Sequence, residues 1–260
     1  LSRTRRCRRS GRLCTEARTS QSRIEQLFAA RVPQEGLDVA RIVVSNITAW
    51  APGLESNEDW KKWARGEKSI LPTNDAPKLE YTDAIFRRRL SQISKMTIQV
   101  IHDLLEKSEA AKDMPQTFVS CRGELAREFS VSKKLVEEKE VSPAAFSLSV
   151  FNTPIALATI AFGLRGGYSA IFPSHGNFRN AFEAACAPIL SGEEKEVMLV
   201  YADELVPEAY KAFGTENFEP LAFAAVLSLS KNGVAISDVS AVPERAADFL
   251  KNIILEDTAF

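Results

Sequence analysis

The sequence predicts an α/β fold in which a five-stranded mixed sheet is covered by helices on both faces. Short β-rich runs alternate with segments whose apolar residues recur at helical spacing, a pattern typical of a sheet packed between helices. Segment 146–163 is almost wholly apolar, which predicts a buried element of the core. The 260 residues are 45% hydrophobic and 26% charged, a composition typical of a globular protein with a sizeable core.

The expected elements follow one another in a simple order. A short helix in 55–67 places Trp60 and Trp63 on one face, and a long helix is expected over 83–111. Segment 124–140 is expected to be a charged, solvated helix or loop. Further helices are expected at about 175–191 and 243–255. The strands are expected at 42–48, 117–121, 168–172, 197–202 and 221–230, with a further strand within 233–242.

The apolar segment 146–163 has the end signals of a helix. Asn152 is a candidate N-cap, Pro154 is tolerated in a first turn, and Gly163 lies where a helix can end. We expect this helix to be buried.

Charge is distributed unevenly along the chain. Residues 1–23 contain eight arginines and one glutamate, so they carry +7, and an overall charge of −1 leaves −8 for the rest. An acidic body disfavours nucleic-acid binding, which requires clustered Lys and Arg. We expect residues 1–40 to be a disordered tail and linker, either an inert extension, a transit peptide or a nucleic-acid arm. No apolar run approaches the roughly 20 residues of a membrane span.

Cysteine and histidine residues offer little chemistry. The four cysteines, Cys7, Cys14, Cys121 and Cys186, form no CxxC pair, which favours free thiols in a reducing compartment such as the cytoplasm. His102 lies off the apolar stripe of its helix, so we expect a solvated side chain. No zinc-ligand spacing is present, and no cofactor or metal is implied.

Three stretches resemble the β-ketoacyl synthases. "VSPAAFSLSVFNTPIALATIAFGLRGGYSAI" resembles the stretch that leads through a buried helix and a Gly-rich turn to the nucleophile strand of that family. "RRRLSQISKM" resembles its RR-rich helix, and "SGEEKEVMLVYADE" resembles its entry into the next strand. The resemblance covers about 41–230 and implies a thiolase-like half, similar to the short ketosynthase-like proteins of aryl polyene and polyketide gene clusters. Residues 41–260 are therefore expected to form a β-ketoacyl synthase N-terminal-like domain.

The resemblance also implies where the nucleophile of the family would lie. That cysteine sits where a strand turns into a helix, because the helix N-terminus favours a thiolate and an oxyanion. In "GGYSAIFPSHGNF" the position falls on His175, or on Ser174 if the alignment shifts by one. A histidine cannot hold a thioester, and a serine needs a base.

Three functions follow as expectations. The first is a non-catalytic, chain-length-factor-like subunit that pairs with an active β-ketoacyl synthase, or with itself, and shares an acyl carrier protein with it. The second is an acyltransferase or thioesterase that uses Ser174, with Asp203 or Glu204 as candidate supporting groups. The third is a scaffold that binds an acyl carrier protein. For the subunit, strand 168–172 is expected at the dimer interface, with Ile171, Phe172, Phe178 and Phe182 as anchors or, alternatively, as ordinary core residues.

Overall fold

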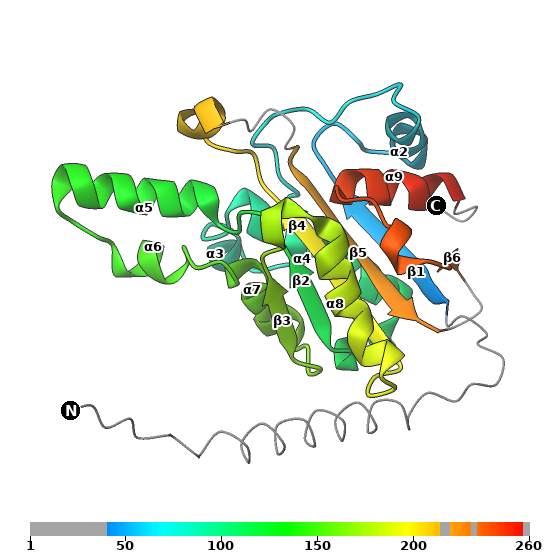
Figure 1. Ribbon diagram of the computed structural model, residues 1–260. Helices are drawn as coiled ribbons and strands as arrows, with labels where there is room; N and C mark the ends of the chain where they lie inside the picture. The colour runs from blue at the N-terminus through cyan, green and yellow to red at the C-terminus, as the bar shows by residue number, and fades with distance from the viewer. Residues whose placement is uncertain (1–40, 214–218, 230–232, 257–260) are drawn as a thin grey trace, which may run out of the picture. The chain divides into compact units, whose positions relative to one another are not determined.

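One mixed sheet of six strands organises the computed structural model, which describes residues 41–213, 219–229 and 233–256 (Figure 1). The predicted tail, residues 1–40, lies outside the described residues. The strand order is β3-β2-β4-β5-β1-β6. β3 and β4 pair with β2 in parallel, whereas β5 runs antiparallel to both of its neighbours, β4 and β1, and β6 runs antiparallel to β1. The strands are β1 (Ile42–Trp50), β2 (Gln116–Val119), β3 (Tyr168–Ile171), β4 (Glu196–Asp203), β5 (Leu221–Ser228) and β6 (Val234–Ile236).

Helices cover both faces of this sheet, as the sequence predicts (Figure 1). α4 (Gln92–Lys107) and α7 (Thr153–Phe162) pack on one face, and α8 (Phe178–Leu190), α9 (Ala246–Glu256) and α2 (Asn57–Ala64) pack on the other. β4 is buried from both sides, because Val197 and Leu199 belong to the second cluster of helices while Met198 and Val200 face the first. A strand buried on both faces reads as a continuous apolar run. The expected fold class and its five strands are thus confirmed, and β6 at the sheet edge confirms the further strand expected within 233–242.

The prediction of one long helix over 83–111 is wrong. This segment divides into α3 (Ala84–Arg87), α4 and a short 3-10 helix, η1 (Glu109–Asp113). Asp83 caps α3 by accepting from the backbone N–H of Ile85 at 2.8 Å, and Ser91 caps α4 by accepting from that of Ser94 at 3.1 Å. Side-chain caps start a new helix even where the apolar spacing continues.

His102 is not the solvated histidine that the sequence predicts. Its ring stacks on Tyr81, with ring centroids 3.7 Å apart, and its side chain is only 26% exposed. Asp103 lies 3.2 Å from its Nδ1 atom. The reason is that the loop before α3 carries Tyr81 back over α4, a contact that helical spacing cannot reveal.

Burial of segment 146–163 is confirmed for one side only. α7 buries Thr153, Pro154, Ile155 and Ala158 and ends at Gly163 with φ +61°, but Ile160 on the same helix is 76% exposed. Asn152 precedes the helix without capping it; its amide donates to the Tyr168 hydroxyl at 2.9 Å. The first part of the segment belongs to α6 (Pro143–Ser147) and the loop after it.

Segment 124–140 forms α5 (Leu125–Glu138), a helix without a single buried residue. α5 and α6 project together from the body as a two-helix arm (Figure 1). Three further 3-10 turns complete the described chain: η2 (Ser174–Gly176), η3 (Glu208–Phe213) and η4 (Val239–Ala241). None of the helices in the described ranges is long and apolar enough to cross a membrane.

Candidate functional site

The candidate site is the turn between β3 and α8. After Ile171 the chain forms η2, in which His175 has φ +54° and Gly176 has φ +68°. A left-handed conformation costs a residue other than glycine about 1 kcal/mol, so the tertiary structure holds His175 in this tight turn. Asn177 then caps α8 by accepting from the backbone N–H of Arg179 at 3.1 Å. The turn therefore has the strand-turn-helix form that the resemblance implies.

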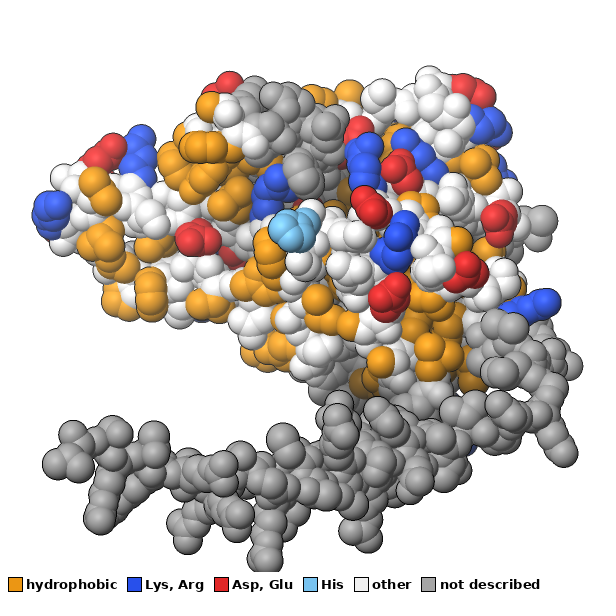
Figure 2. Space-filling view, viewed as in Figure 1, with side chains coloured by type: hydrophobic (Ala, Val, Ile, Leu, Met, Phe, Trp, Pro, Cys, Tyr) orange, Lys and Arg blue, Asp and Glu red, His pale blue; other side chains and the backbone are white. Residues whose placement is uncertain are grey.

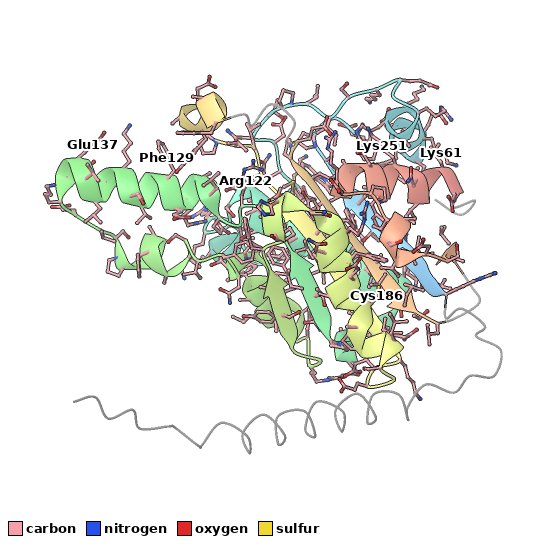
Figure 3. All side chains as sticks on the ribbon, in the orientation of Figure 1. Lys61, Arg122, Phe129, Glu137, Cys186 and Lys251 are labelled. Carbon is pink, nitrogen blue, oxygen red and sulfur yellow. The ribbon has the colours of Figure 1, made fainter. Side chains whose placement is uncertain are left out.

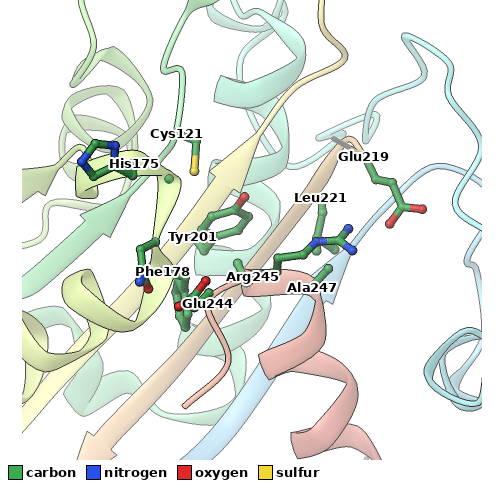
Figure 4. Close-up of a pocket in the computed structure, with 12 residues that line it drawn as sticks. Cys121, His175, Phe178, Tyr201, Glu219, Leu221, Glu244, Arg245 and Ala247 are labelled. Atoms are coloured by element: carbon green, nitrogen blue, oxygen red, sulfur yellow. The ribbon is translucent and has the colours of Figure 1, made fainter. Parts of the chain in front are cut away.

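A pocket of about 320 Å³ opens beside this turn (Figure 4). His175 and Cys121 lie at one end of it, and Glu219 lies at the other. Arg245 and the first residues of α9 line it between these ends. Its lining residues are Cys121, His175, Gly176, Asn177, Phe178, Tyr201, Glu219, Leu221, Glu244, Arg245, Ala246 and Ala247.

The Cys121 thiol lies beside the turn, although this residue follows the end of β2. A Cβ atom added to Gly176 would lie 3.9 Å from its Sγ atom. Burial, reinforced by the nearby Asp203 carboxylate, raises the pKa of Cys121 to about 12. A thiol with such a pKa is almost entirely protonated at neutral pH, so Cys121 is a poor nucleophile.

Asp203 holds the loop that carries Cys121. Its carboxylate accepts from the Ser120 hydroxyl at 2.7 Å and from the Tyr201 hydroxyl at 2.6 Å. The backbone N–H groups of Cys121 and Arg122 also donate to it, at 3.1 Å and 3.2 Å. Burial raises the pKa of Asp203 despite these donors. All its acceptor capacity is used to fix the loop, so Asp203 has a structural role here.

Ser174 receives no support from either carboxylate suggested by the sequence. Asp203 is bound as above, and Glu204 accepts from the backbone N–H of Ala126 at 2.8 Å, at the start of α5. His102 lies on α4, stacked on Tyr81, and the sequence contains no histidine besides it and His175. Among the described residues, no hydrogen bond joins Ser174 to a base, and Cys121 and His175 line the same end of the pocket without a hydrogen bond between them. The described residues also contain no cluster of His, Cys, Asp or Glu able to hold a metal ion.

The four candidate interface residues fall into two groups. Phe178 and Phe182 are at most 1% exposed and pack on Phe249 with ring centroids 5.1 Å and 5.2 Å away, which makes them core residues. They are therefore unavailable as surface anchors. Ile171 is partly buried, whereas Phe172 is 62% exposed at the end of β3.

Sequence analysis missed the cluster of Ser120, Cys121, Tyr201 and Asp203. A signal for it exists in "SCRG" and "YADE", which end neighbouring strands of the sheet. Val119 of β2 pairs with Tyr201 of the parallel strand β4. Since polar residues at the carboxyl ends of parallel strands meet at one edge, this cluster could have been expected.

The six-stranded mixed sheet and its covering helices define the class of protein: an α/β fold similar to that of solved ketosynthase structures. A model of the β-ketoacyl synthase N-terminal domain matches residues 60–250, nearly three quarters of the chain. The chain therefore belongs to the β-ketoacyl synthase N-terminal domain family.

Solved structures show the same fold at low sequence identity. One is a complex of a ketosynthase (ApeO) with its chain length factor (ApeC) from Xenorhabdus doucetiae, with 21% identity and a TM-score of 0.69. That match covers 84% of this chain and 92% of the other.

Two further similar structures are the ishigamide ketosynthase/chain length factor (12% identity, TM-score 0.53) and the AntDE:AntF complex of a ketosynthase with an acyl-carrier protein (14%, 0.56). Each match covers 72% of this chain, which spans 62% and 63% of those chains. A search of curated proteins finds no match.

Proposed function

We propose that this chain is a non-catalytic, chain-length-factor-like subunit that pairs with an active β-ketoacyl synthase in the assembly of a fatty acyl or polyketide chain. The observation that carries the proposal is the turn at Ser174 and His175. It keeps the strand-turn-helix form of a nucleophile site, yet the turn itself contains no cysteine, and among the described residues His175 makes no hydrogen bond to Ser174 or to Cys121. A fold that keeps the backbone of a nucleophile site but not the catalytic side chains is suited to pairing with a catalytic subunit.

The edge strand β3 supplies a surface for that assembly. It pairs with β2 on one side only, and Tyr168, Ser169 and Ala170 are all exposed. An edge strand presents unpaired N–H and C=O groups that can bind a second strand. Two such strands related by a two-fold or pseudo-two-fold axis would pair antiparallel and join two sheets into one. Phe172, exposed at the end of β3, is the proposed apolar anchor of this contact, with Ile171 beside it.

The similarity in length to one solved chain supports the same proposal. The match to the ketosynthase–chain length factor complex covers 84% of this chain and 92% of the other, so the two chains are of similar length. We also propose an acyl carrier protein as a further partner, which would bring the growing chain to the pair, in line with the AntDE:AntF complex.

Analytical ultracentrifugation tests the pairing. We expect this chain to form a stable heterodimer at micromolar concentration with the ketosynthase encoded nearest to its gene, and to form a homodimer without it. Phe172→Asp should weaken the pairing, because it places a charge in the apolar contact. Leu255→Asp is the matched control, since Leu255 is 54% exposed on α9, which lies on the β1 side of the sheet, away from β3. A chain that stays monomeric, both alone and when mixed with this ketosynthase, would contradict the proposal.

A further inference from the structure

Two buried carboxylates lie where the starts of α4 and α5 meet the end of β4. Glu124 directly precedes α5 and is 1% exposed, and Glu204 directly follows β4 and is 3% exposed. Figure 2 shows Lys, Arg, Asp and Glu side chains intermixed on the face in view, and the surface is where charged groups are normally found. A pair of buried carboxylates therefore needs compensating contacts.

Glu124 has the contacts that an ionised carboxylate needs. Its Oε1 atom accepts from the Ser91 and Ser94 hydroxyls at 2.7 Å and 2.5 Å. Its Oε2 atom accepts from the Nε atom of Arg127 at 3.1 Å, and the Arg127 side chain also donates to the backbone carbonyl of Arg89 at 2.7 Å. Both oxygens of Glu124 are thus satisfied, and its negative charge is paired with a guanidinium.

Glu204 is held in a different way, by backbone groups. The backbone N–H of Ala126 donates to its Oε1 atom at 2.8 Å, and the backbone N–H of Ile93 also donates to it. Ala126 lies in the first turn of α5, and Ile93 lies in the first turn of α4. Since α5 has no capping side chain of its own, Glu204 takes the place of a cap from a distant strand.

The charges around Glu204 oppose its ionisation. Burial, reinforced by the carboxylates of Glu124 and Asp203, raises its pKa from 4.5 to about 7. The guanidinium of Arg127 is paired with Glu124, and Arg122, which Figure 3 places in the loop that leads to α5, lies beside Asp203. In the described part of the chain, no cation forms an ion pair with Glu204. Glu204 therefore holds its proton in weakly acidic solution and loses it near neutral pH.

A hollow of about 500 Å³ gives the ionised side chain somewhere to go. Glu204 lies in its wall, together with Gln92 and Lys95 of α4 and Ala126 and Arg127 of α5. Apart from Lys95, Arg127 and Glu204 itself, the residues of this wall are uncharged. A carboxylate that turns into the hollow gains hydration and shares the space with the ammonium group of Lys95.

We propose that Glu204 is a pH-dependent latch for the start of α5. The neutral carboxyl stays buried and accepts from the backbone N–H of Ala126. The ionised carboxylate turns into the hollow and gives up its proton to water, which releases the first turn of α5 from the end of β4. The latch acts within this chain and does not depend on the proposed function.

Amide hydrogen exchange of the full chain, followed by NMR from pH 5 to pH 8, tests the latch. After correction for the intrinsic exchange rate, the protection of the Ala126 and Glu128 amides should fall about tenfold per pH unit up to about pH 7, because opening then releases one proton. It should level off at higher pH, where Glu204 is ionised in both forms. The amides of β5 should be much better protected, since they open only when the whole chain unfolds.

Glu204→Gln keeps an oxygen that accepts from the Ala126 N–H but has no proton to lose, so the protection of Ala126 should no longer depend on pH. Glu128→Gln is the matched control, because it removes an exposed carboxylate from the same first turn and should keep the slope of the native chain. If Glu204→Gln does not fold, the carboxyl carbon of Glu204 in the native chain should titrate near pH 7, and a midpoint near pH 4.5 would overturn the proposal.

Other results would contradict the latch as well. Protection of Ala126 that does not change with pH in the native chain would show that no proton is released on opening. Equal protection of Ala126 and the β5 amides would show that the start of α5 opens only with the whole chain. A native slope in Glu204→Gln would assign the titration to a different group. Each of these three results would overturn the proposal and leave the proposed function standing.

Discussion

The Tyr201 hydroxyl donates a hydrogen bond to Asp203 across two residues of β4, at 2.6 Å, and both side chains are buried. Burial and the neighbouring carboxylate raise the pKa of Tyr201 well above 10, so its hydroxyl keeps the proton that it donates. Together with Ser120, this pair fixes the loop after β2 that places Cys121 beside the turn of Ser174 and His175. The pair thus shapes one end of the pocket.

Replacement of Asp203 by Asn should lower the free energy of unfolding by about 1–3 kcal/mol, because the new amide would point N–H groups at the donors of Ser120, Cys121 and Arg122. Tyr201→Phe removes one donor and leaves the others, so its effect should be smaller, about 1 kcal/mol. Urea unfolding measures both. Equal stabilities of Asp203→Asn and the native chain would contradict the structural role of Asp203.

Stability should fall as the pH rises from about 4.5 to about 7 because of Glu204. Burial raises its pKa from 4.5 to about 7. Between these values the folded chain holds a proton that the unfolded chain has lost, so the contribution of this group is most favourable below pH 4.5 and declines up to about pH 7. The change amounts to at most about 3 kcal/mol. In Glu204→Gln, unfolding measured from pH 5 to pH 8 should show a shallower fall, and an unchanged slope would contradict the shifted pKa.

Catalytic silence is expected of the purified chain. Incubation with acyl-carrier-protein thioesters should leave its intact mass unchanged, because Ser174 lacks a base and the pKa of Cys121 is about 12. For the same reason, iodoacetamide at pH 8 should modify Cys121 far more slowly in the folded chain than in the unfolded one. An acyl adduct that disappears in Ser174→Ala would instead favour an independent enzyme.

Two substitutions on α7 should have opposite outcomes. Ala158→Asp should make the chain insoluble, because Ala158 is fully buried and an unpaired charge in an apolar core costs several kcal/mol. Ile160→Asp is the control on the same helix, and since Ile160 is 76% exposed the variant should remain soluble. The soluble fraction after expression measures both, and a soluble, folded Ala158→Asp chain would contradict the packing of α7.

The spacing of apolar residues and the residues at element ends were sufficient to predict most strands and several helices of this protein. The five expected strands and the helices α2, α8 and α9 follow from periodicity and end signals, because these depend on neighbouring residues. The resemblance carried by three short stretches likewise identified the family and the turn at Ser174 and His175, since both are encoded in contiguous sequence.

The tertiary structure alone decided which apolar and polar residues meet. The sequence gives no reason to expect different burial for Phe172 and Phe178. In the structure Phe178 packs on Phe249 of α9, whereas Phe172 is exposed after the end of β3. Asp203 meets Ser120, 83 positions away, only because β2 and β4 are neighbours in the sheet. The exposure of Leu135 and Val136 was equally hidden, because α5 is amphipathic like any packed helix and only the arrangement of the elements leaves its apolar residues uncovered. Burial is a property of distant contacts, which a periodic pattern does not encode.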